Sequence, residues 1–134
     1  MSARILIVED ESIVQLDLQD RLQRMGHSVV GSAVSGEEAV AKAAELRPDL
    51  VLMDVRLEGK MDGIQAAMQI RSDREVPVLF LTAHSADVGE QQQARLQPRV
   101  TKPFRATELQ SAISQALKDV HPYRDPSEEP SETV

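Results

Sequence analysis

Short apolar runs that end in polar residues recur along this chain, and they predict β-strands. A continuous apolar run bounded by turn residues is typical of a strand that is buried on both faces of a parallel sheet. The expected strands cover residues 4–8, 27–33, 50–54, 78–81 and 99–101. The run of residues 50–53 leads directly into Asp54, so we expect its carboxylate at the carboxyl end of the strand. In open α/β sheets, that edge is where ligands bind.

Between the strands, apolar residues spaced three or four positions apart predict helices. The expected helices cover residues 12–25, 36–46, 63–72, 87–96 and 106–120. Ser12 and Gln15 have the spacing of a capping box at the start of the first helix, and Ser35 and Glu38 have it at the second. The fourth helix should be the least stable, because Gly89 and three consecutive glutamines weaken its propensity and its apolar face.

The same spacing predicts which side chains of the second and third helices contact the sheet. These side chains are Val40, Ala43, Ala44, Ile64, Ala67 and Met68. His27 stands at the start of a strand, and we expect it on the surface.

Five strands alternating with five helices predict an α/β fold, with one parallel sheet and helices on both of its faces. Each connection is long enough for a right-handed β-α-β crossover. We expect one domain over residues 3–120. Residues 121–134 hold three prolines and four acids, so we expect a disordered tail or a linker there. The pattern leaves the order of the strands open.

Composition narrows the classes of function. The 134 residues carry a net charge of −7 and only three aromatic side chains, which disfavours nucleic-acid binding because that needs basic patches and stacking surfaces. The absence of cysteine excludes disulfides and thiol chemistry. We see neither a signal-peptide pattern nor an apolar run of membrane-spanning length, so we expect a cytoplasmic protein that does not bind a membrane.

Three acids would meet at the carboxyl edge of a parallel sheet. Glu9 and Asp10 follow the first strand, and Asp54 ends the third. Carboxylates that close repel one another, and a bound cation is the simplest relief. Oxygen ligands without histidine or cysteine favour Mg²⁺ over Zn²⁺. Glu9 or Asp10 alone would be explained as well by the charge preference of a helix N-terminus, so this interpretation depends on Asp54.

Thr82 and Lys102 follow two further strands and would lie at the same edge. Each has an ordinary explanation when taken alone, because threonine favours strands and lysine is usually a surface residue. Together with Asp54 and a cation they form a plausible set for phosphoryl transfer. In such a set the carboxylate attacks phosphorus, and the lysine offsets the charge of the phosphoryl oxygens.

Five short motifs occur in an order and spacing that resemble the receiver domains of two-component response regulators. They are Glu9-Asp10, Met53-Asp54, Asp62-Gly63, Leu81-Thr82-Ala83 and Lys102-Pro103-Phe104. The resemblance covers about residues 3–120 and implies a stand-alone receiver of the CheY-like type. The implied fold is flavodoxin-like, a three-layer α/β/α sandwich around a five-stranded parallel sheet of order 2-1-3-4-5.

The resemblance implies a role for each acid. Asp54 matches the phosphoacceptor, Asp10 the direct Mg²⁺ ligand, and Glu9 the acid that acts on the ion largely through water. The backbone carbonyl of Arg56 would complete the metal site. The phosphoryl group would come from a phosphohistidine of a sensor histidine kinase in a Mg²⁺-dependent reaction.

The resemblance also implies a switch beside the phosphoacceptor. Thr82 matches the hydroxyl that moves to the phosphoryl group, Ala83 the amide beside it, and Lys102 the lysine that pairs with the phosphate. A cis Lys102–Pro103 bond is implied as well. The conformational change would control a downstream protein that the sequence does not name, with a homodimer as one form of the output.

Two features depart from the family pattern. Arg99 stands where the family usually has the aromatic residue that rotates with the switch threonine, so we expect the output surface to be read differently. The loop at 55–63 is one residue longer than usual and has Glu58 in place of a proline, as in receivers of some hybrid or less common sensor kinases. In this family the side chains of Arg56 and His84 would tune the lifetime of the phosphoryl group.

Two other functions fit part of the pattern. A Mg²⁺-dependent phosphatase with an aspartyl nucleophile typically needs a second acid two residues after the nucleophile, where this chain has Arg56. A pure binding module, such as a degenerate receiver or a flavin carrier, would not need the complete set of site residues. We therefore expect a phosphoacceptor that assists its own phosphorylation and dephosphorylation, and not an enzyme.

Overall fold

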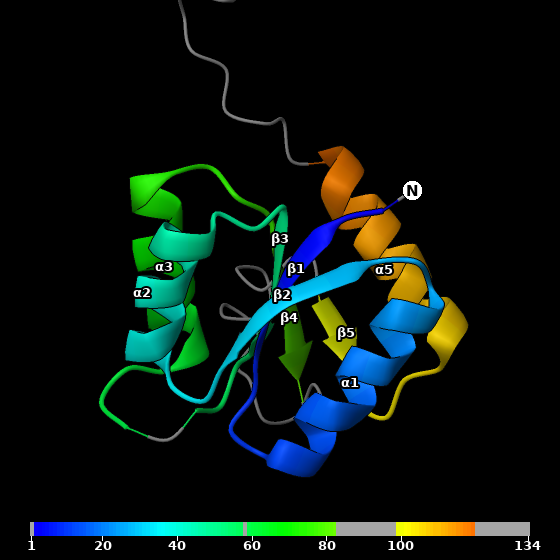
Figure 1. Ribbon diagram of the computed structural model, residues 1–134. Helices are drawn as coiled ribbons and strands as arrows, with labels where there is room; N and C mark the ends of the chain where they lie inside the picture. The colour runs from blue at the N-terminus through cyan, green and yellow to red at the C-terminus, as the bar shows by residue number, and fades with distance from the viewer. Residues whose placement is uncertain (1, 58, 83–98, 120–134) are drawn as a thin grey trace, which may run out of the picture.

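A five-stranded parallel sheet lies between two layers of helices in the computed structural model, which describes residues 2–57, 59–82 and 99–119 (Figure 1). The strands are β1 (Arg4–Val8), β2 (Ser28–Ala33), β3 (Leu50–Asp54), β4 (Val78–Thr82) and β5 (Arg99–Thr101). The described helices are α1 (Ser12–Arg24), α2 (Gly36–Leu46), α3 (Gly63–Asp73) and α5 (Ala106–Asp119). The strand order is β2-β1-β3-β4-β5, which confirms the predicted fold class.

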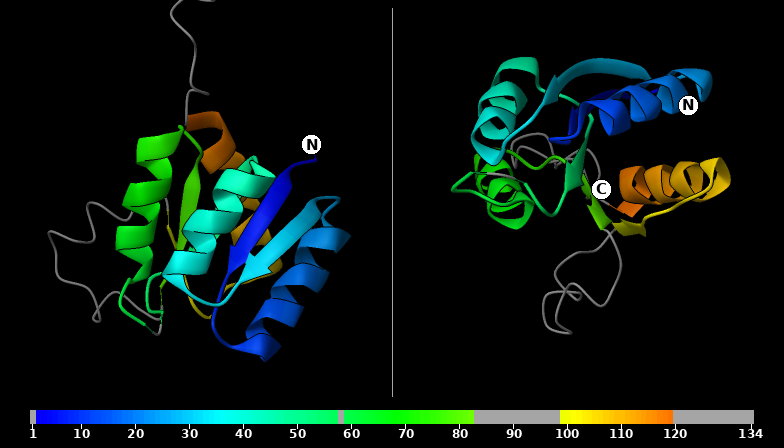
Figure 2. Two further views of the ribbon diagram at one scale, coloured as in Figure 1. Left: turned by 60° about the vertical axis from the view of Figure 1, so that its left-hand side comes forward. Right: turned by 90° about the horizontal axis from the view of Figure 1, so that it is seen from below.

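The two layers of helices bury opposite faces of the sheet. Figure 2 shows α1 and α5 on one side and α2 and α3 on the other. Successive side chains of a strand point to opposite faces, so β3 contributes Leu50 and Leu52 to the core under α1 and α5, and Val51 and Met53 to the core under α2 and α3. Burial on both faces explains why this strand is continuously apolar.

Two expected segments lie outside the described residues. One is the helix predicted at 87–96, and the other is the tail predicted at 121–134. Within the described part of the chain, no helix is long and apolar enough to cross a membrane.

The capping box predicted at Ser12 and Gln15 is wrong. Helix α1 has Glu11 at its N-cap, without a side-chain hydrogen bond, and the Gln15 side chain donates to backbone carbonyls outside the helix. At α2 the Ser35 hydroxyl accepts from the Glu38 N–H as predicted, but the Glu38 carboxylate accepts from Val34 rather than from Ser35. A complete capping box does occur at α3, between Asp62 and Gln65.

Two of the side chains expected to face the sheet are exposed. Met68 is 64% exposed, and Ala44 is exposed as well. Met68 follows the buried Ala67, and Ala44 follows the buried Ala43. Successive side chains of an α-helix point about 100° apart, so the residue after a buried one turns away from the sheet. The inward stripe of α3 continues instead to Ile70.

His27 was expected on the surface, and this prediction is wrong. The side chain is only 5% exposed. Its Nδ1 accepts a hydrogen bond from the Ala3 N–H at 3.1 Å, and its Nε2 lies 3.3 Å from Oε1 of Gln110 in α5. An imidazole can be buried when both ring nitrogens have partners, and here the partners are Ala3, just before β1, and Gln110 of α5.

Candidate functional site

The register of the sheet brings the predicted site residues to one edge. Val8 pairs with Met53 between β1 and β3, so the next residues, Glu9 and Asp54, are neighbours at the carboxyl ends of these strands. On the other side, Asp54 pairs with Leu81, and Thr82 pairs with Thr101 of β5. Lys102 follows Thr101 directly, so it enters the same edge.

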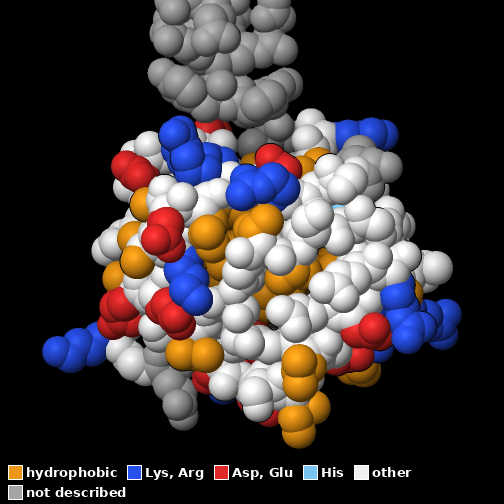
Figure 3. Space-filling view, viewed as in Figure 1, with side chains coloured by type: hydrophobic (Ala, Val, Ile, Leu, Met, Phe, Trp, Pro, Cys, Tyr) orange, Lys and Arg blue, Asp and Glu red, His pale blue; other side chains and the backbone are white. Residues whose placement is uncertain are grey.

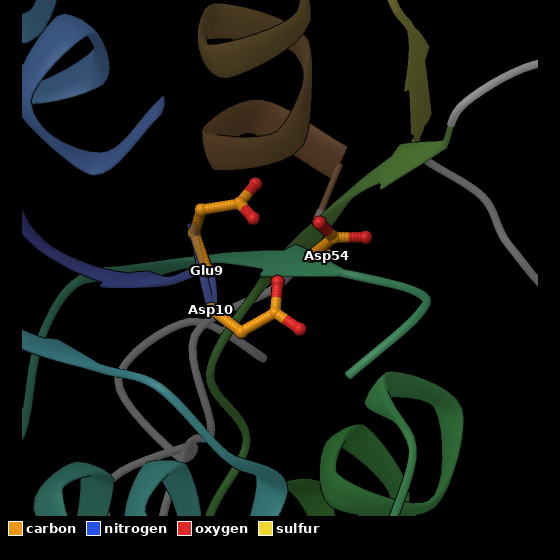
Figure 4. Close-up of side chains that lie close together, drawn as sticks. All are labelled: Glu9, Asp10 and Asp54. Atoms are coloured by element: carbon orange, nitrogen blue, oxygen red, sulfur yellow. The ribbon is translucent and has the colours of Figure 1, made fainter. Parts of the chain in front are cut away.

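Three carboxylates converge at this edge. One oxygen atom from each of Glu9, Asp10 and Asp54 lies within 4.8 Å of the others, and Figure 4 shows the three side chains around a shared space. Glu9 and Asp54 are buried and Asp10 is half-buried. The predicted meeting of these acids is therefore confirmed.

Lys102 bridges two of the acids. Its Nζ lies 3.0 Å from Glu9 Oε1 and 3.2 Å from Asp54 Oδ2. The peptide bond that follows it, Lys102–Pro103, is cis, as the resemblance implied. Lys102 is thus not the free surface lysine of the alternative explanation.

Backbone amides donate to the second carboxylate oxygen of Glu9 and of Asp54. The Glu11 N–H donates to Glu9 Oε2 at 3.1 Å, and the Arg56 N–H donates to Asp54 Oδ1 at 3.0 Å.

Behind Asp54, the start of α3 packs so tightly that a Cβ added to Gly63 would lie 2.0 Å from the Asp54 carbonyl oxygen. This contact explains on physical grounds why glycine follows Asp62.

The electrostatics of the site favour a cation. Burial raises the pKa of Glu9, and the neighbouring Asp54 raises it further, while Lys102 and the Glu11 N–H act in the opposite direction. For Lys102, burial by itself lowers the pKa, but Asp54 and Glu9 outweigh it, so that the net pKa is raised and the ammonium stays charged. One ammonium faces two buried carboxylates, with a third nearby.

Thr82 places a buried hydroxyl at this edge. Its Oγ1 is buried and has no hydrogen-bond partner among the residues that the structure describes. Its backbone carbonyl accepts from the Lys102 N–H at 2.7 Å. Since an unpaired buried hydroxyl is unfavourable, it is a natural acceptor or donor for a group that enters the site. Ala83 and His84 lie outside the described residues.

The residues present fit a hard divalent ion. Their donors are carboxylate oxygens, the ligands that Mg²⁺ prefers, and the half-buried position of Asp10 leaves room for water ligands. Burial is the main cause of the raised pKa of Glu9, and Asp54 adds to it; a cation would offset the repulsion between these two carboxylates.

Two contacts around the site were not predicted. The side-chain amide of Gln15 in α1 donates a hydrogen bond to the Glu9 carbonyl at 2.6 Å. Phe104 stands two residues after Lys102, and the Arg21 guanidinium of α1 lies over its ring, 5.6 Å from the centroid. Neither contact has a local signal in the sequence, because the partners meet only through the packing of α1.

A parallel sheet of order 2-1-3-4-5 with three acids and a lysine at its carboxyl edge defines a receiver-type α/β domain. The model of the response regulator receiver domain matches residues 5–114, and the chain belongs to this family. The predicted family is thus confirmed, whereas the expected domain boundaries at 3 and 120 stay predictions.

Two curated relatives carry regulatory names. The chain is 41% identical over 116 residues to the transcriptional regulatory protein PdtaR of Mycobacterium tuberculosis, covering 85% of this chain and 56% of PdtaR. It is 37% identical over 120 residues to the phyllosphere-induced regulator PhyR of Methylorubrum extorquens, covering 87% of this chain and 44% of PhyR. The chain therefore spans about half the length of these relatives.

Solved structures agree with the fold. The receiver domain of the Erythrobacter litoralis PhyR response regulator, solved by NMR in solution, superposes with a TM-score of 0.81 at 32% identity, over 92% of this chain and 96% of that one. The receiver domain of a sensor histidine kinase from Pseudomonas aeruginosa superposes with a TM-score of 0.76 at 33% identity, over 89% of this chain and 100% of that one. That structure has a magnesium ion coordinated in its active-site cleft.

Proposed function

We propose that this receiver domain accepts a phosphoryl group on Asp54 from the phosphohistidine of a sensor histidine kinase, and that it changes conformation in response. The observation that carries the proposal is the buried Asp54 carboxylate, which lies among Lys102, the Arg56 N–H and the two acids that follow β1. An Asp54 oxygen attacks phosphorus as the P–N bond of the donor breaks and the electron pair leaves with the imidazole. In hydrolysis, water attacks phosphorus and the bond to Asp54 breaks.

The other residues act on charge and position. Asp10, Asp54, the backbone carbonyl of Arg56 and, through water, Glu9 would hold Mg²⁺. When bound, the ion offsets negative charge on the phosphoryl oxygens. Lys102, already within 3.2 Å of Asp54, pairs with the incoming phosphoryl group as its bond to that carboxylate is replaced.

Thr82 is the proposed switch. Its buried hydroxyl, which has no hydrogen-bond partner in the described part of the chain, gains one when it bonds to a phosphoryl oxygen, with the amide of Ala83 beside it. The movement shifts the population of conformations at the end of β4 and at Arg99 on β5. A downstream protein in the cytoplasm reads this change, and a phosphorylation-dependent homodimer stays a prediction.

We propose a phosphoacceptor and not a phosphatase, because no acid stands two residues after Asp54. That position is Arg56, whose N–H donates to the Asp54 carboxylate. An aspartyl phosphate formed here would lack the side-chain acid that assists turnover in such enzymes.

Phosphorylation by a small donor tests the proposal. Incubation with acetyl phosphate and Mg²⁺ should add one phosphoryl group, seen by intact-mass spectrometry and lost on treatment with hydroxylamine, as expected of an acyl phosphate. Asp54→Asn should abolish the adduct, and EDTA should prevent it. An adduct that persists in Asp54→Asn would sink the assignment of Asp54, and steady turnover of a phosphomonoester would favour the phosphatase.

A further inference from the structure

Gln15 is a polar side chain beside the site, and the proposed chemistry gives it no role. It lies near the start of α1, and its Nε2 donates to the carbonyl oxygens of Glu9 at 2.6 Å and of Ala33 at 3.1 Å. Both partners are carbonyls, which only accept, so the orientation of the carboxamide is determined by chemistry. The side chain joins the ends of β1 and β2.

Both backbone polar groups of Glu9 are hydrogen-bonded in this arrangement. The Glu9 N–H donates to the Ala33 carbonyl at 3.0 Å, and the Glu9 carbonyl accepts from Gln15. The carbonyl of Glu9 belongs to the planar peptide unit that ends at the Cα of Asp10. Its direction therefore fixes the positions of the Asp10 N–H and Cα, and so limits the directions from which the Asp10 side chain can leave the backbone.

The two acids depend on this peptide to different degrees. The Glu9 carboxylate has contacts of its own, with Lys102 at 3.0 Å and with the Glu11 N–H at 3.1 Å. The half-buried Asp10 carboxylate accepts no hydrogen bond from any residue that the structure describes. The approach of Asp10 to Asp54 thus depends on the backbone, which Gln15 restrains.

We propose that Gln15 is a positioning residue for the metal site, and that it holds the Glu9–Asp10 peptide so that the Asp10 carboxylate converges with Asp54. The inference rests on the proposed function, because it takes these acids to bind Mg²⁺. Without the carboxamide, the cation has to order the peptide itself, which weakens binding. Partners outside the ligand shell typically contribute about 10- to 100-fold in metal affinity, and we expect the lower end here because Gln15 acts through the backbone.

The test compares Gln15→Met with Gln23→Met. Methionine keeps the length and helix propensity of glutamine but has no donor, and Gln23 is an exposed residue of the same helix. The Mg²⁺ dissociation constant is measured by calorimetry and by NMR shift titration of the site amides. We expect about a 10-fold increase for Gln15→Met and no change for Gln23→Met. The rate of phosphorylation by acetyl phosphate should recover in Gln15→Met as Mg²⁺ is raised to saturation.

Equal dissociation constants for the wild type and Gln15→Met would overturn the positioning role, and so would a phosphorylation defect that saturating Mg²⁺ does not rescue. Should Gln15→Met fail to fold, Gln15→Asn keeps the amide but shortens its reach by one methylene, and it should weaken Mg²⁺ binding in the same way. A wild-type protein that neither binds Mg²⁺ nor accepts phosphate contradicts the proposed function itself, and the role of Gln15 with it.

Discussion

The carboxyl group of Glu9 is fully buried, and its contacts with Lys102 and the Glu11 N–H offset only part of the cost of burying its charge. Burial raises its pKa, Asp54 adds to the rise, and the contacts with Lys102 and the Glu11 N–H do not cancel it. A carboxyl whose pKa is higher in the folded state binds its proton more tightly there than in the unfolded chain. Its contribution to stability is therefore fully present below the unfolded pKa and is lost as the pH rises through the folded pKa.

Glu9→Gln should remove this pH dependence from the metal-free protein. The free energy of unfolding of the variant, relative to the wild type, should rise as the pH increases above about 4, the ordinary pKa of glutamate, because only the wild type has to ionise a buried carboxyl whose pKa is raised. Urea unfolding in EDTA at a series of pH values measures the difference. Glu45→Gln, which replaces an exposed acid far from the site, is the matched control and should change little. A relative stability that falls with rising pH would contradict the raised pKa.

Among the elements, α1 connects the two halves of the site. Gln15 near its start holds the loop that carries the acids, and Arg21 in its last turns contacts Phe104 in the loop that carries Lys102. The Arg21 guanidinium also donates to the Phe104 carbonyl at 3.5 Å. One helix thus supports both chain segments that meet at Asp54.

The start of α2 shows the opposite electrostatic balance from Glu9. The Glu38 carboxylate accepts from the Val34 N–H at 2.8 Å and pairs with Lys42 at 3.2 Å. The bond from Val34 is the main cause of a lowered pKa for Glu38, with a smaller contribution from Lys42. A lowered folded pKa stabilises the protein above the unfolded pKa, and this stability is lost as the pH falls through the folded pKa.

Glu38→Ala should lower the free energy of unfolding at pH 7 by about 0.5–1 kcal/mol, because it removes a helix-end hydrogen bond and an exposed ion pair. Glu37→Ala is the matched control, since Glu37 stands in the same first turn, and it should have a smaller effect. The difference between the two variants should shrink below about pH 4, where glutamate becomes protonated. Urea unfolding at pH 7 and pH 3 checks this, and a difference that grows in acid would argue against the lowered pKa.

On the surface of the molecule, two exposed apolar side chains lie near the start of α1, close in sequence to the acids of the site. Ile13 is 81% exposed and Leu16 is 65% exposed, both near the start of α1 and close in sequence to Glu9 and Asp10. Figure 3 shows hydrophobic side chains protruding at the bottom of the molecule, the end at which α1 begins in Figure 1. A protein donor that reaches Asp54 would cover this surface.

Ile13→Ala and Leu16→Ala should therefore slow phosphotransfer from a sensor histidine kinase by about 5- to 10-fold in kcat/KM, the effect of removing one significant interface contact. Phosphorylation by acetyl phosphate should not change, because a small donor needs no such surface. Met68→Ala removes an exposed apolar side chain from α3, on the other side of the sheet, and serves as the control. Equal losses with both donors would place the defect in the site rather than in docking.

The kinase itself is found by profiling phosphotransfer against the sensor kinases of the source organism.

Much of this molecule is predictable because its signals are local. The strand of residues 50–54 is apolar because both of its faces are buried, and Asp54 stands at the point where the chain leaves the core. The turn residues and the spacing of the apolar positions predict the described helices to within a few residues. The errors concern single side chains. Met68 lies one position past the buried stripe of its helix, and the partners of His27 come from segments distant in the sequence.

The alternation of elements, the receiver family and the set of chemically competent residues could be predicted from the sequence, because apolar spacing, turn residues and short motifs are local along the chain. Which of those residues meet depends on how the strands and helices pack. Lys102 and Glu9 are 93 positions apart, and their contact depends on the register of β3 and β4, the two strands that lie between β1 and β5 in the sheet. Gln15 has the spacing of a helix cap, yet it bonds to two strands, because its donors find their acceptors only after the sheet has been assembled.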